Sequence, residues 1–213
     1  ALNEISQAIN STLDLQETLT LIASYSIHLM NVEATSVLLC DEDKGDLWFA
    51  AASGLGADLV LGERLEMGQG VAGWVAQHGE PALVNTVSDD TRVYQGFDQD
   101  GVFITHSLLC VPLRSKGKII GVLEAVNKIA RPFDREDMRL LSALAAPAAT
   151  AIENAQLFEQ VRAGRERLRA LSRRLVDIQE AERGRVAREL HDETGQALSS
   201  LLLGLNMLEW EAE

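Results

Sequence analysis

The sequence has 213 residues, of which 46% are hydrophobic and 24% are charged, a balance typical of globular proteins. The net charge of −13 opposes contact with nucleic-acid phosphates, so we expect no nucleic acid among the partners. No apolar run approaches the roughly 18 residues that cross a bilayer, and no signal peptide opens the chain. We expect a cytoplasmic location, and we leave open a membrane anchor upstream in the parent protein.

The ends of the sequence indicate a part of a longer protein, because it begins with Ala1 instead of methionine and its helical pattern runs to Glu213. The length suits one domain of common size with an additional segment. Residues 1–158 carry a net charge of −11, whereas residues 159–213 carry −2 and contain arginine as their only basic residue type. The two parts therefore differ in character.

The first thirty residues predict two helices. Residues 1–13 have apolar side chains at helical spacing, which favours an N-terminal helix. The next helix begins after Asp14, an N-cap residue, and Glu17 follows three residues later as its capping-box partner.

Strand patterns dominate the middle of the chain. The expected strands, in order, are a hairpin at 35–53, a short strand at 64–67, another at 82–84 and a second hairpin at 107–128. Cys40 and Cys110 lie in apolar runs of these hairpins, which indicates buried, reduced thiols and no disulfide.

Helices and one long loop separate these strands. A short helix is expected at 70–78, ended by Gly79 and Pro81, and a long helix begins at Asp134. Residues 86–105 form a polar, irregular connection, and loops of that length are usually functional or mobile. Helices flanking a mainly antiparallel sheet make an α+β fold.

The order of these elements resembles a GAF domain. The resemblance rests on "MGQGVAGWVAQHGEPALVNTV", "SLLCVPLRSKGKIIGVLEAVNK" and "FDREDMRLLSALAAPAATAIENAQLF" and covers residues 14–158. It implies a sensing module for small molecules or redox state, with a central antiparallel sheet. Because GAF domains bind many ligands and sometimes none, the ligand of this domain stays unknown at this stage.

Several ligand-site interpretations carry less weight. "GQGVAG" (68–73) fits a dinucleotide fingerprint, but hairpins surround it where a parallel βαβ unit is required, so tight-turn glycines are favoured. His106 is a weak haem-ligand candidate, and a structural role is favoured for it. Cys110 indicates a core thiol instead of a bilin attachment site.

A cyclic-nucleotide interpretation is also weak. Asn127 and Lys128, followed by Phe133 and Asp137, are similar to the signature of cyclic-nucleotide-binding GAF domains. Met138 stands where that signature ends in glutamate. We expect Lys128 to pair with a neighbouring acid instead of a nucleotide.

The segment 159–180 predicts a parallel coiled coil. Apolar or small residues recur in steps of three and four, at Asn154, Leu157, Val161, Gly164, Leu168, Leu171, Leu175 and Ile178. The same register would next place Glu182, Arg185 and Glu189 in the seam. The apolar stripe instead resumes one residue late, at Val186 and Leu190, and such a skip changes the local winding of a coiled coil.

Residues 181–213 strongly resemble the first helix of the dimerisation and phosphotransfer domain of bacterial sensor histidine kinases, in the subfamily of the nitrate and membrane-fluidity sensors. The matching residues are Glu182, Arg183, Arg185, Ala187, Arg188, Leu190, His191, Asp192, Gly195, Gln196 and Leu198. The second bundle helix and the ATP-binding domain would follow Glu213, so we expect this fragment alone to be inactive.

The resemblance assigns the site residues. His191 is the phosphoacceptor, since a neutral imidazole is a nucleophile near pH 7, and Asp192 is the base. Gln196, on the same face as Asp192, is implied to position water for dephosphorylating the partner regulator. Arg188 and Arg185 can offset phosphate charge.

We therefore expect the sensor part of a two-component histidine kinase. It forms a homodimer, passes its phosphoryl group to a response-regulator receiver domain, takes ATP and Mg²⁺ through the missing domain, and has no metal site of its own. A non-catalytic GAF ligand-binding scaffold with a degenerate kinase helix is the alternative. A GAF-regulated cyclase or phosphodiesterase is a second rival, which the kinase-type helix disfavours.

Overall fold

The structure, a computed structural model, describes residues 8–9, 12–94, 96 and 103–211, and the side chains of all of these except 187, 189, 192–193, 197 and 200–211. Two compact units result, Ala1–Gln160 and Val161–Glu213. Most of the N-terminal helix expected at 1–13 lies outside the described residues. None of the described helices is long and apolar enough to cross a membrane.

Six antiparallel strands form one sheet in the order β3-β2-β1-β6-β5-β4. The strands are β1 (Val32–Asp41), β2 (Asp46–Gly54), β3 (Arg64–Glu66), β4 (Ala82–Val84), β5 (Leu108–Ser115) and β6 (Lys118–Lys128). Both predicted hairpins and both short strands are confirmed. The α+β fold class is confirmed with them.

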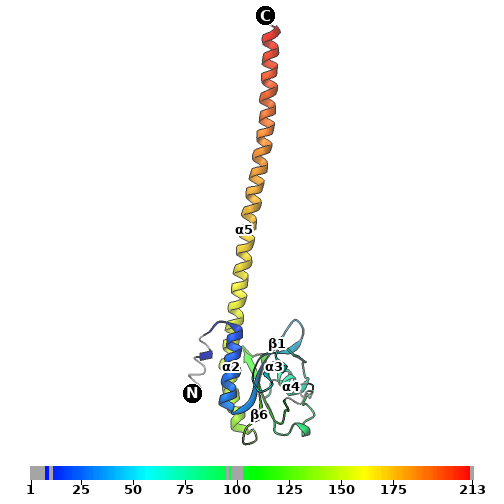
Figure 1. Ribbon diagram of the computed structural model, residues 1–213, viewed down its shortest axis with the longest axis vertical. Helices are drawn as coiled ribbons and strands as arrows, with labels where there is room; N and C mark the ends of the chain where they lie inside the picture. Colours follow the sequence, from blue (N-terminus) through cyan, green and yellow to red (C-terminus); the bar gives the residue numbers. More distant parts are fainter. Residues whose placement is uncertain (1–7, 10–11, 95, 97–102, 212–213) are drawn as a thin grey trace. The chain divides into compact units, whose positions relative to one another are not determined.

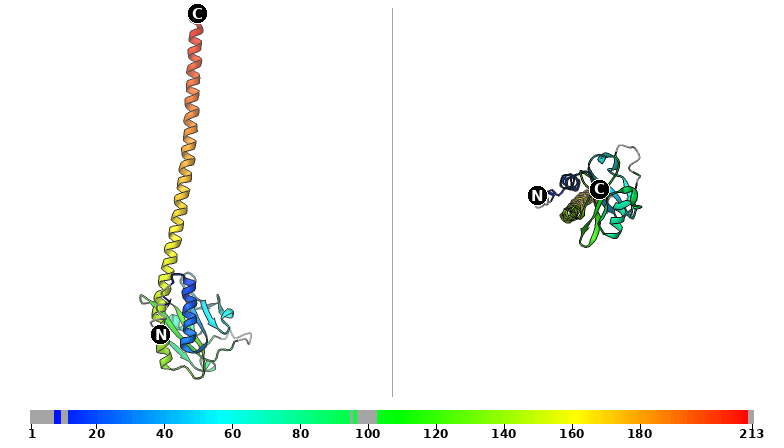
Figure 2. Two further views of the ribbon diagram at one scale, coloured as in Figure 1. Left: turned by 60° about the vertical axis from the view of Figure 1, so that its left-hand side comes forward. Right: turned by 90° about the horizontal axis from the view of Figure 1, so that it is seen from below.

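Helices cover the two faces of the sheet (Figure 1). They are α2 (Leu15–Met30), α3 (Ala57–Val60), α4 (Gly70–His78) and α5 (Arg135–Glu211), with a 3₁₀ turn η1 (Val87–Asp89). On one face α2 and the first turns of α5 lie side by side (Figure 2) and bury a core with Leu39, Leu109 and Leu123. On the other, α4 packs on Leu38, Val122 and Val126. We did not expect α3 from the sequence.

The starts of the helices follow their sequence signals with one difference. Asp14 accepts a hydrogen bond from the Glu17 backbone N–H at 2.9 Å, as the N-cap prediction requires. The capping-box partnership is wrong, because the Glu17 carboxylate accepts instead from the Thr12 hydroxyl at 2.6 Å. At α5, Asp134 accepts from the backbone N–H groups of Glu136 and Asp137, which confirms the predicted start.

The two cysteines differ in environment. Both are free thiols. Cys110 on β5 is fully buried, as expected. Cys40 is only half-buried, which corrects the expectation of two core thiols. It stands one residue before the end of β1.

Candidate functional site

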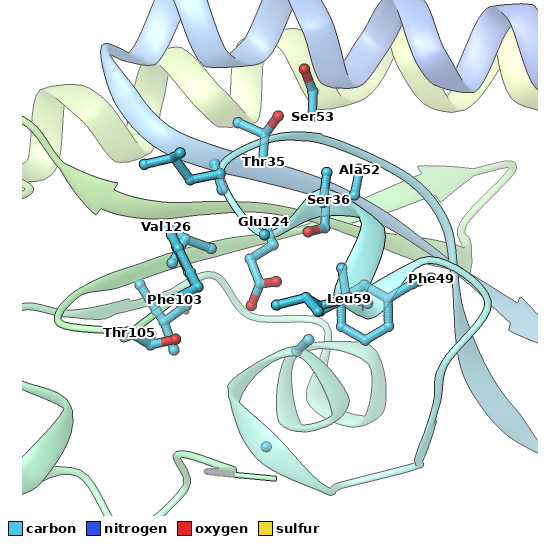
Figure 3. A pocket seen from close by; sticks show the side chains of 18 of the residues that line it. Thr35, Ser36, Phe49, Ala52, Ser53, Leu59, Phe103, Thr105, Glu124 and Val126 are labelled. Atoms are coloured by element: carbon cyan, nitrogen blue, oxygen red, sulfur yellow. The ribbon is translucent and has the colours of Figure 1, made fainter. Parts of the chain in front are cut away.

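A cavity of about 80 Å³ lies between the sheet and the short helices α3 and α4 (Figure 3). Its wall is mostly apolar, with Phe49, Leu59, Leu65, Val71, Phe103, Leu108 and Val126 among the lining side chains. One water molecule needs roughly 10–15 Å³ of cavity volume. The cavity therefore has room for several water molecules or for one small organic molecule. Ligand sites are commonly concave and largely apolar in this way, with few polar groups.

Among the described residues that line the cavity, Glu124 is the only charged one. Alternate residues of a strand point to opposite faces of the sheet, so Glu124 shares the cavity face with Val122 and Val126, while Leu123 and Ala125 belong to the opposite core. Figure 3 shows its carboxyl group directed into the cavity. An acid here occupies a position at which the strand pattern calls for an apolar side chain.

The partners of Glu124 lie directly across the sheet. Ser36 on β1 and Cys110 on β5 are its register neighbours. The Cys110 thiol donates a hydrogen bond to Glu124 Oε1 at 3.4 Å. Burial raises the pKa of Glu124 to about 7, and the thiol hydrogen bond offsets this in part. Burial also raises the pKa of Cys110, and the nearby Glu124 charge adds to the effect.

Glycines let two loop aromatics close over the cavity. Gly56 has a φ of +72°, and a Cβ there would lie 3.0 Å from Phe103 Cβ. Gly70 has a φ of +69°, and a Cβ there would lie 3.2 Å from Tyr94 Cβ. Both positions combine a backbone conformation that favours glycine with a close approach.

The "GQGVAG" stretch forms a turn and the first residues of α4, and it is not part of a βαβ unit. Gly68 and Gly70 have positive φ values, and a Cβ at Gly73 would lie 2.8 Å from the Glu66 carbonyl oxygen. These glycines serve the tight passage from β3 into α4. The sheet around them is antiparallel, which excludes the βαβ unit that a Rossmann site needs.

Lys128 and Asp137 confirm the expected local ion pair. Lys128 Nζ lies 2.9 Å from Asp137 Oδ1. Burial opposes ionisation of Asp137, yet hydrogen bonds from Arg131 and Lys128 hold the pKa of Asp137 below its usual range. Neither residue lines the cavity.

Asn127 has a structural role of the same kind. Its side-chain oxygen accepts from the backbone N–H groups of His106 and Ser107, at 2.7 and 3.2 Å. Its amide group donates to Glu33 and to the Ile104 carbonyl oxygen, both at 2.8 Å. It fastens the end of the long loop to the sheet.

His106 and His78 both lie outside the cavity. His106 is exposed. His78 stacks on Trp74 with ring centroids 4.5 Å apart. Within the part of the chain that the structure describes, no three His, Cys, Asp or Glu side chains are grouped to hold a metal ion.

His191 lies on α5 with its side chain exposed. A Cβ on Gly195, one turn later, would meet nothing within 4 Å, so the surface beside His191 is open. Gln196 is exposed on the same helix, and the side chain of Asp192 lies outside the described residues.

The two arginines before His191 are engaged within the helix. Arg185 donates to both carboxylate oxygens of Glu182, at 3.0 and 2.6 Å. Arg188 Nε donates to the Gly184 carbonyl oxygen at 3.1 Å. Both side chains are exposed, so each can leave these weak local contacts for a phosphate.

An apolar stripe runs along the second unit. Val161, Leu168, Leu171, Leu175 and Ile178 are all more than half exposed in the single chain. These are the residues of the predicted seam. An exposed apolar stripe of this length marks an interaction surface.

The sequence reasoning missed Glu124 and Ser36. The signal for Glu124 was present in "IIGVLEAVNK", where one acid interrupts a run of apolar residues that a core strand needs. Ser36 carried no signal of its own, because only the pairing of β1 with β6 places it opposite Glu124.

Comparisons with known proteins agree with these two parts. The chain belongs to the GAF domain family, whose model matches residues 12–153. A second family model, described as "Histidine kinase", matches residues 182–213. The chain thus combines a GAF domain with a histidine kinase segment.

Two curated relatives are similar over the GAF part. The chain is 37% identical over 114 residues to a dual 3',5'-cyclic-AMP and -GMP phosphodiesterase 11A of Takifugu rubripes, with 52% of this chain and 13% of that protein covered. It is 30% identical over 106 residues to a probable 3',5'-cyclic phosphodiesterase of Caenorhabditis elegans, with 50% and 15% covered. The chain therefore spans no more than 15% of the length of these two relatives.

A solved structure matches over the whole domain. The GAF domain of an Acinetobacter phosphoenolpyruvate-protein phosphotransferase is 28% identical, with a TM-score of 0.64, and the match covers 73% of this chain and 92% of that one. This likeness confirms the expected GAF fold.

Proposed function

We propose that this chain is the sensor and phosphoacceptor part of a two-component histidine kinase. The GAF domain receives the signal, and an ATP-binding domain of the parent protein, which holds ATP and Mg²⁺, phosphorylates His191. The phosphoryl group then passes to an aspartate of a response regulator. The observation that carries the proposal is the group of eleven motif residues around His191, in a segment that matches a histidine kinase family.

The chemistry follows from residue types and spacing. One imidazole nitrogen of His191 attacks the γ-phosphorus of ATP, and the bond from that phosphorus to the bridging oxygen breaks, so that ADP leaves. The other nitrogen gives up its proton to Asp192, the neighbouring carboxylate. Gln196 positions the water that dephosphorylates the regulator. The open surface over Gly195 leaves room for a nucleotide or a receiver domain beside the ring.

Arg188 and Arg185 can compensate the charge of a phosphate on His191 only after they leave their present contacts. Arg188 is exposed, and its contact among the described residues is with a carbonyl oxygen of its own helix, so it can turn to a phosphorylated His191 at little cost. Arg185 first has to leave Glu182. We therefore assign the larger part of the charge compensation to Arg188.

The chain acts as a homodimer in this proposal. The exposed stripe of the second unit would be buried against a second copy in a parallel coiled coil. A signal in the GAF domain then reaches His191 through a change in the packing of the paired helices.

The similarity to phosphodiesterases suggests a cyclic nucleotide as the ligand of the GAF domain. The positions of the described motif residues do not support this ligand. Asn127 accepts a hydrogen bond from the His106 backbone, and Lys128 forms an ion pair with Asp137. None of these three motif residues lines the cavity. The alternative of a non-catalytic scaffold remains the one to test.

Phosphorylation decides between the kinase and the scaffold. A polypeptide that continues this chain through its ATP-binding domain is incubated with labelled ATP, and the label is tested for the acid lability of phosphohistidine. We expect His191→Gln to abolish labelling. The control His78→Gln changes an exposed histidine of α4 and should leave labelling unchanged. Labelling that survives His191→Gln, or none in the wild type, favours the scaffold.

A further inference from the structure

The GAF cavity contains a chemical mismatch. A carboxylic acid is surrounded by apolar side chains, and Glu124 is only 9% exposed. Burying a carboxylate without a cation is costly, so buried charges in proteins are usually paired. Among the described residues, Glu124 has no ion-pair partner and one hydrogen-bond donor, the weak thiol of Cys110.

No described side chain of the domain pairs with Glu124 as a cation. Arg92 is one basic residue that could pair with Glu124. Its guanidinium group instead forms an ion pair with Asp90 at 2.6 Å and lies over the Trp74 ring, 4.7 Å from the ring centroid. Lys128 is held by Asp137 at 2.9 Å. Neither residue lines the cavity. The carboxyl group is directed into the cavity (Figure 3), and none of the described lining residues is a cation.

The surroundings of the carboxyl group suit an organic cation. Ser36, opposite Glu124 on β1, adds a hydroxyl to the same region of the wall. Phe49 and Phe103 line the cavity, and aromatic faces attract a cation as well as an apolar body. An ammonium group near Glu124 would find an anion, a hydroxyl and aromatic faces together.

We infer that the GAF pocket binds a small organic cation, a primary ammonium or amidinium group on a short apolar body, with Glu124 as its counter-ion. The N–H groups donate to the Glu124 carboxylate, and the body lies against the apolar wall. This rests on the proposed function only in taking the GAF domain as the signal input. The cavity volume limits the ligand to a few heavy atoms beyond the charged group.

The pocket binds such a ligand in a pH-dependent way. Only the carboxylate form pairs with a cation, and burial brings the pKa of Glu124 to about 7. Among the described residues, the other titratable groups near Glu124 are the Cys110 thiol on β5 and the Tyr94 phenol from the loop, and the Arg92 charge acts on Cys110. The described residues of β1, β2, α3 and α4 present no titratable group to the cavity. Affinity for the cation therefore falls as pH drops, by about tenfold between pH 8 and pH 6.

Matched probes test the inference on the 213-residue chain. Butylammonium is compared with butanol, which has a similar size without charge, by ligand-observed NMR titration. We expect the ammonium probe to bind at least tenfold more tightly at pH 8, and its advantage to shrink at pH 6. Equal binding of the alcohol, a preference for it, or no detectable ammonium binding would overturn the inference.

A variant links the effect to Glu124. Glu124→Gln keeps shape and hydrogen-bonding capacity, so it should remove the preference for ammonium and its pH dependence. Glu80→Gln changes an exposed acid outside the cavity and should keep both. If Glu124→Gln does not fold, the comparison of ammonium binding by the wild type at pH 8 and pH 6 still tests the inference.

The binding test does not depend on phosphorylation. Loss of the cation preference with intact labelling of His191 refutes the ligand class alone. Normal cation binding without labelling of His191 refutes the kinase role alone. The two proposals therefore fail separately.

Discussion

Lys128 and Asp137 form a buried ion pair between the end of β6 and the first turn of α5. Their side chains are only 6% and 4% exposed, and Lys128 Nζ also donates to the Met30 carbonyl oxygen at the end of α2. Arg131 donates to both carboxylate oxygens of Asp137, at 2.6 and 2.9 Å. Three elements of the domain thus meet at one carboxylate, at the point where the long helix begins.

Neutralising that carboxylate should destabilise the domain. Asp137→Asn leaves the buried Lys128 cation without its anion, and breaking a buried pair costs roughly 3–5 kcal/mol. Urea denaturation monitored by tryptophan fluorescence would measure the loss. As the control, Glu42→Gln breaks the exposed pair with Lys118, for which we expect at most about 1 kcal/mol. Similar losses in both variants would contradict the role assigned to Asp137.

The free energy of unfolding should depend on pH through Glu124. Its pKa is about 7 in the folded domain, above the ordinary value of 4.5, so the folded state holds the proton more tightly. The contribution of Glu124 to stability is therefore greatest below pH 4.5 and is lost as pH rises through 7. The loss between pH 5 and pH 8 should be about 2–3 kcal/mol.

Two variants isolate this dependence. Glu124→Gln stays neutral at every pH, so it should flatten the curve of unfolding free energy and exceed the wild type at pH 8. Glu80→Gln should follow the wild-type curve. A parallel decline in wild type and Glu124→Gln would show that another group causes it.

The apolar stripe predicts which substitutions disrupt the dimer. Leu175 lies in the seam, whereas its neighbour Val176 points outward in the same heptad register, and both are more than half exposed in the single chain. Leu175→Arg should raise the dimer dissociation constant by at least about a hundredfold, since it places two guanidinium groups in an apolar interface. Sedimentation velocity over a concentration series measures this. Val176→Arg should leave the dimer intact; equal weakening by both would reject the register.

The skip in the stripe predicts a switch. Val186 and Leu190 stand one residue later than the register of Leu171 and Leu175 requires. Deleting Ala181 brings them into that register and should lock the parent kinase in one state, on or off, whatever the signal. Signal-dependent labelling of His191 is the measurement. A deletion variant that still responds normally would rule out the skip as the switching element.

The strands and helix starts could be predicted because local rules fix them. Alternating apolar residues and the turn at "DEDKGD" specify the β1–β2 hairpin, and Asp14 and Asp134 cap their helices through contacts with residues three positions away or fewer. The short helix α3 was missed because "ADLV" is a single turn without a capping side chain.

The pocket could not be predicted because it depends on contacts between distant segments. Ser36 and Glu124 are 88 positions apart in the sequence and become neighbours only through the β1–β6 register. The motif residues around His191 could be recognised, because a kinase helix carries its pattern in consecutive turns. The residues that line a ligand pocket in a sheet domain come from several strands, and these strands become neighbours only when the chain folds.

The two edges of the sheet are formed by its shortest strands. β3 and β4 have three residues each, so each edge offers another chain very few unpaired N–H and C=O groups for strand addition. These short edge strands disfavour two kinds of association: pairing of the sheet with the sheet of another copy, and addition of an extended peptide as a further strand. The helix-mediated dimer proposed above therefore has little competition from the sheet edges, and a change in how its helices pack is free to travel along them.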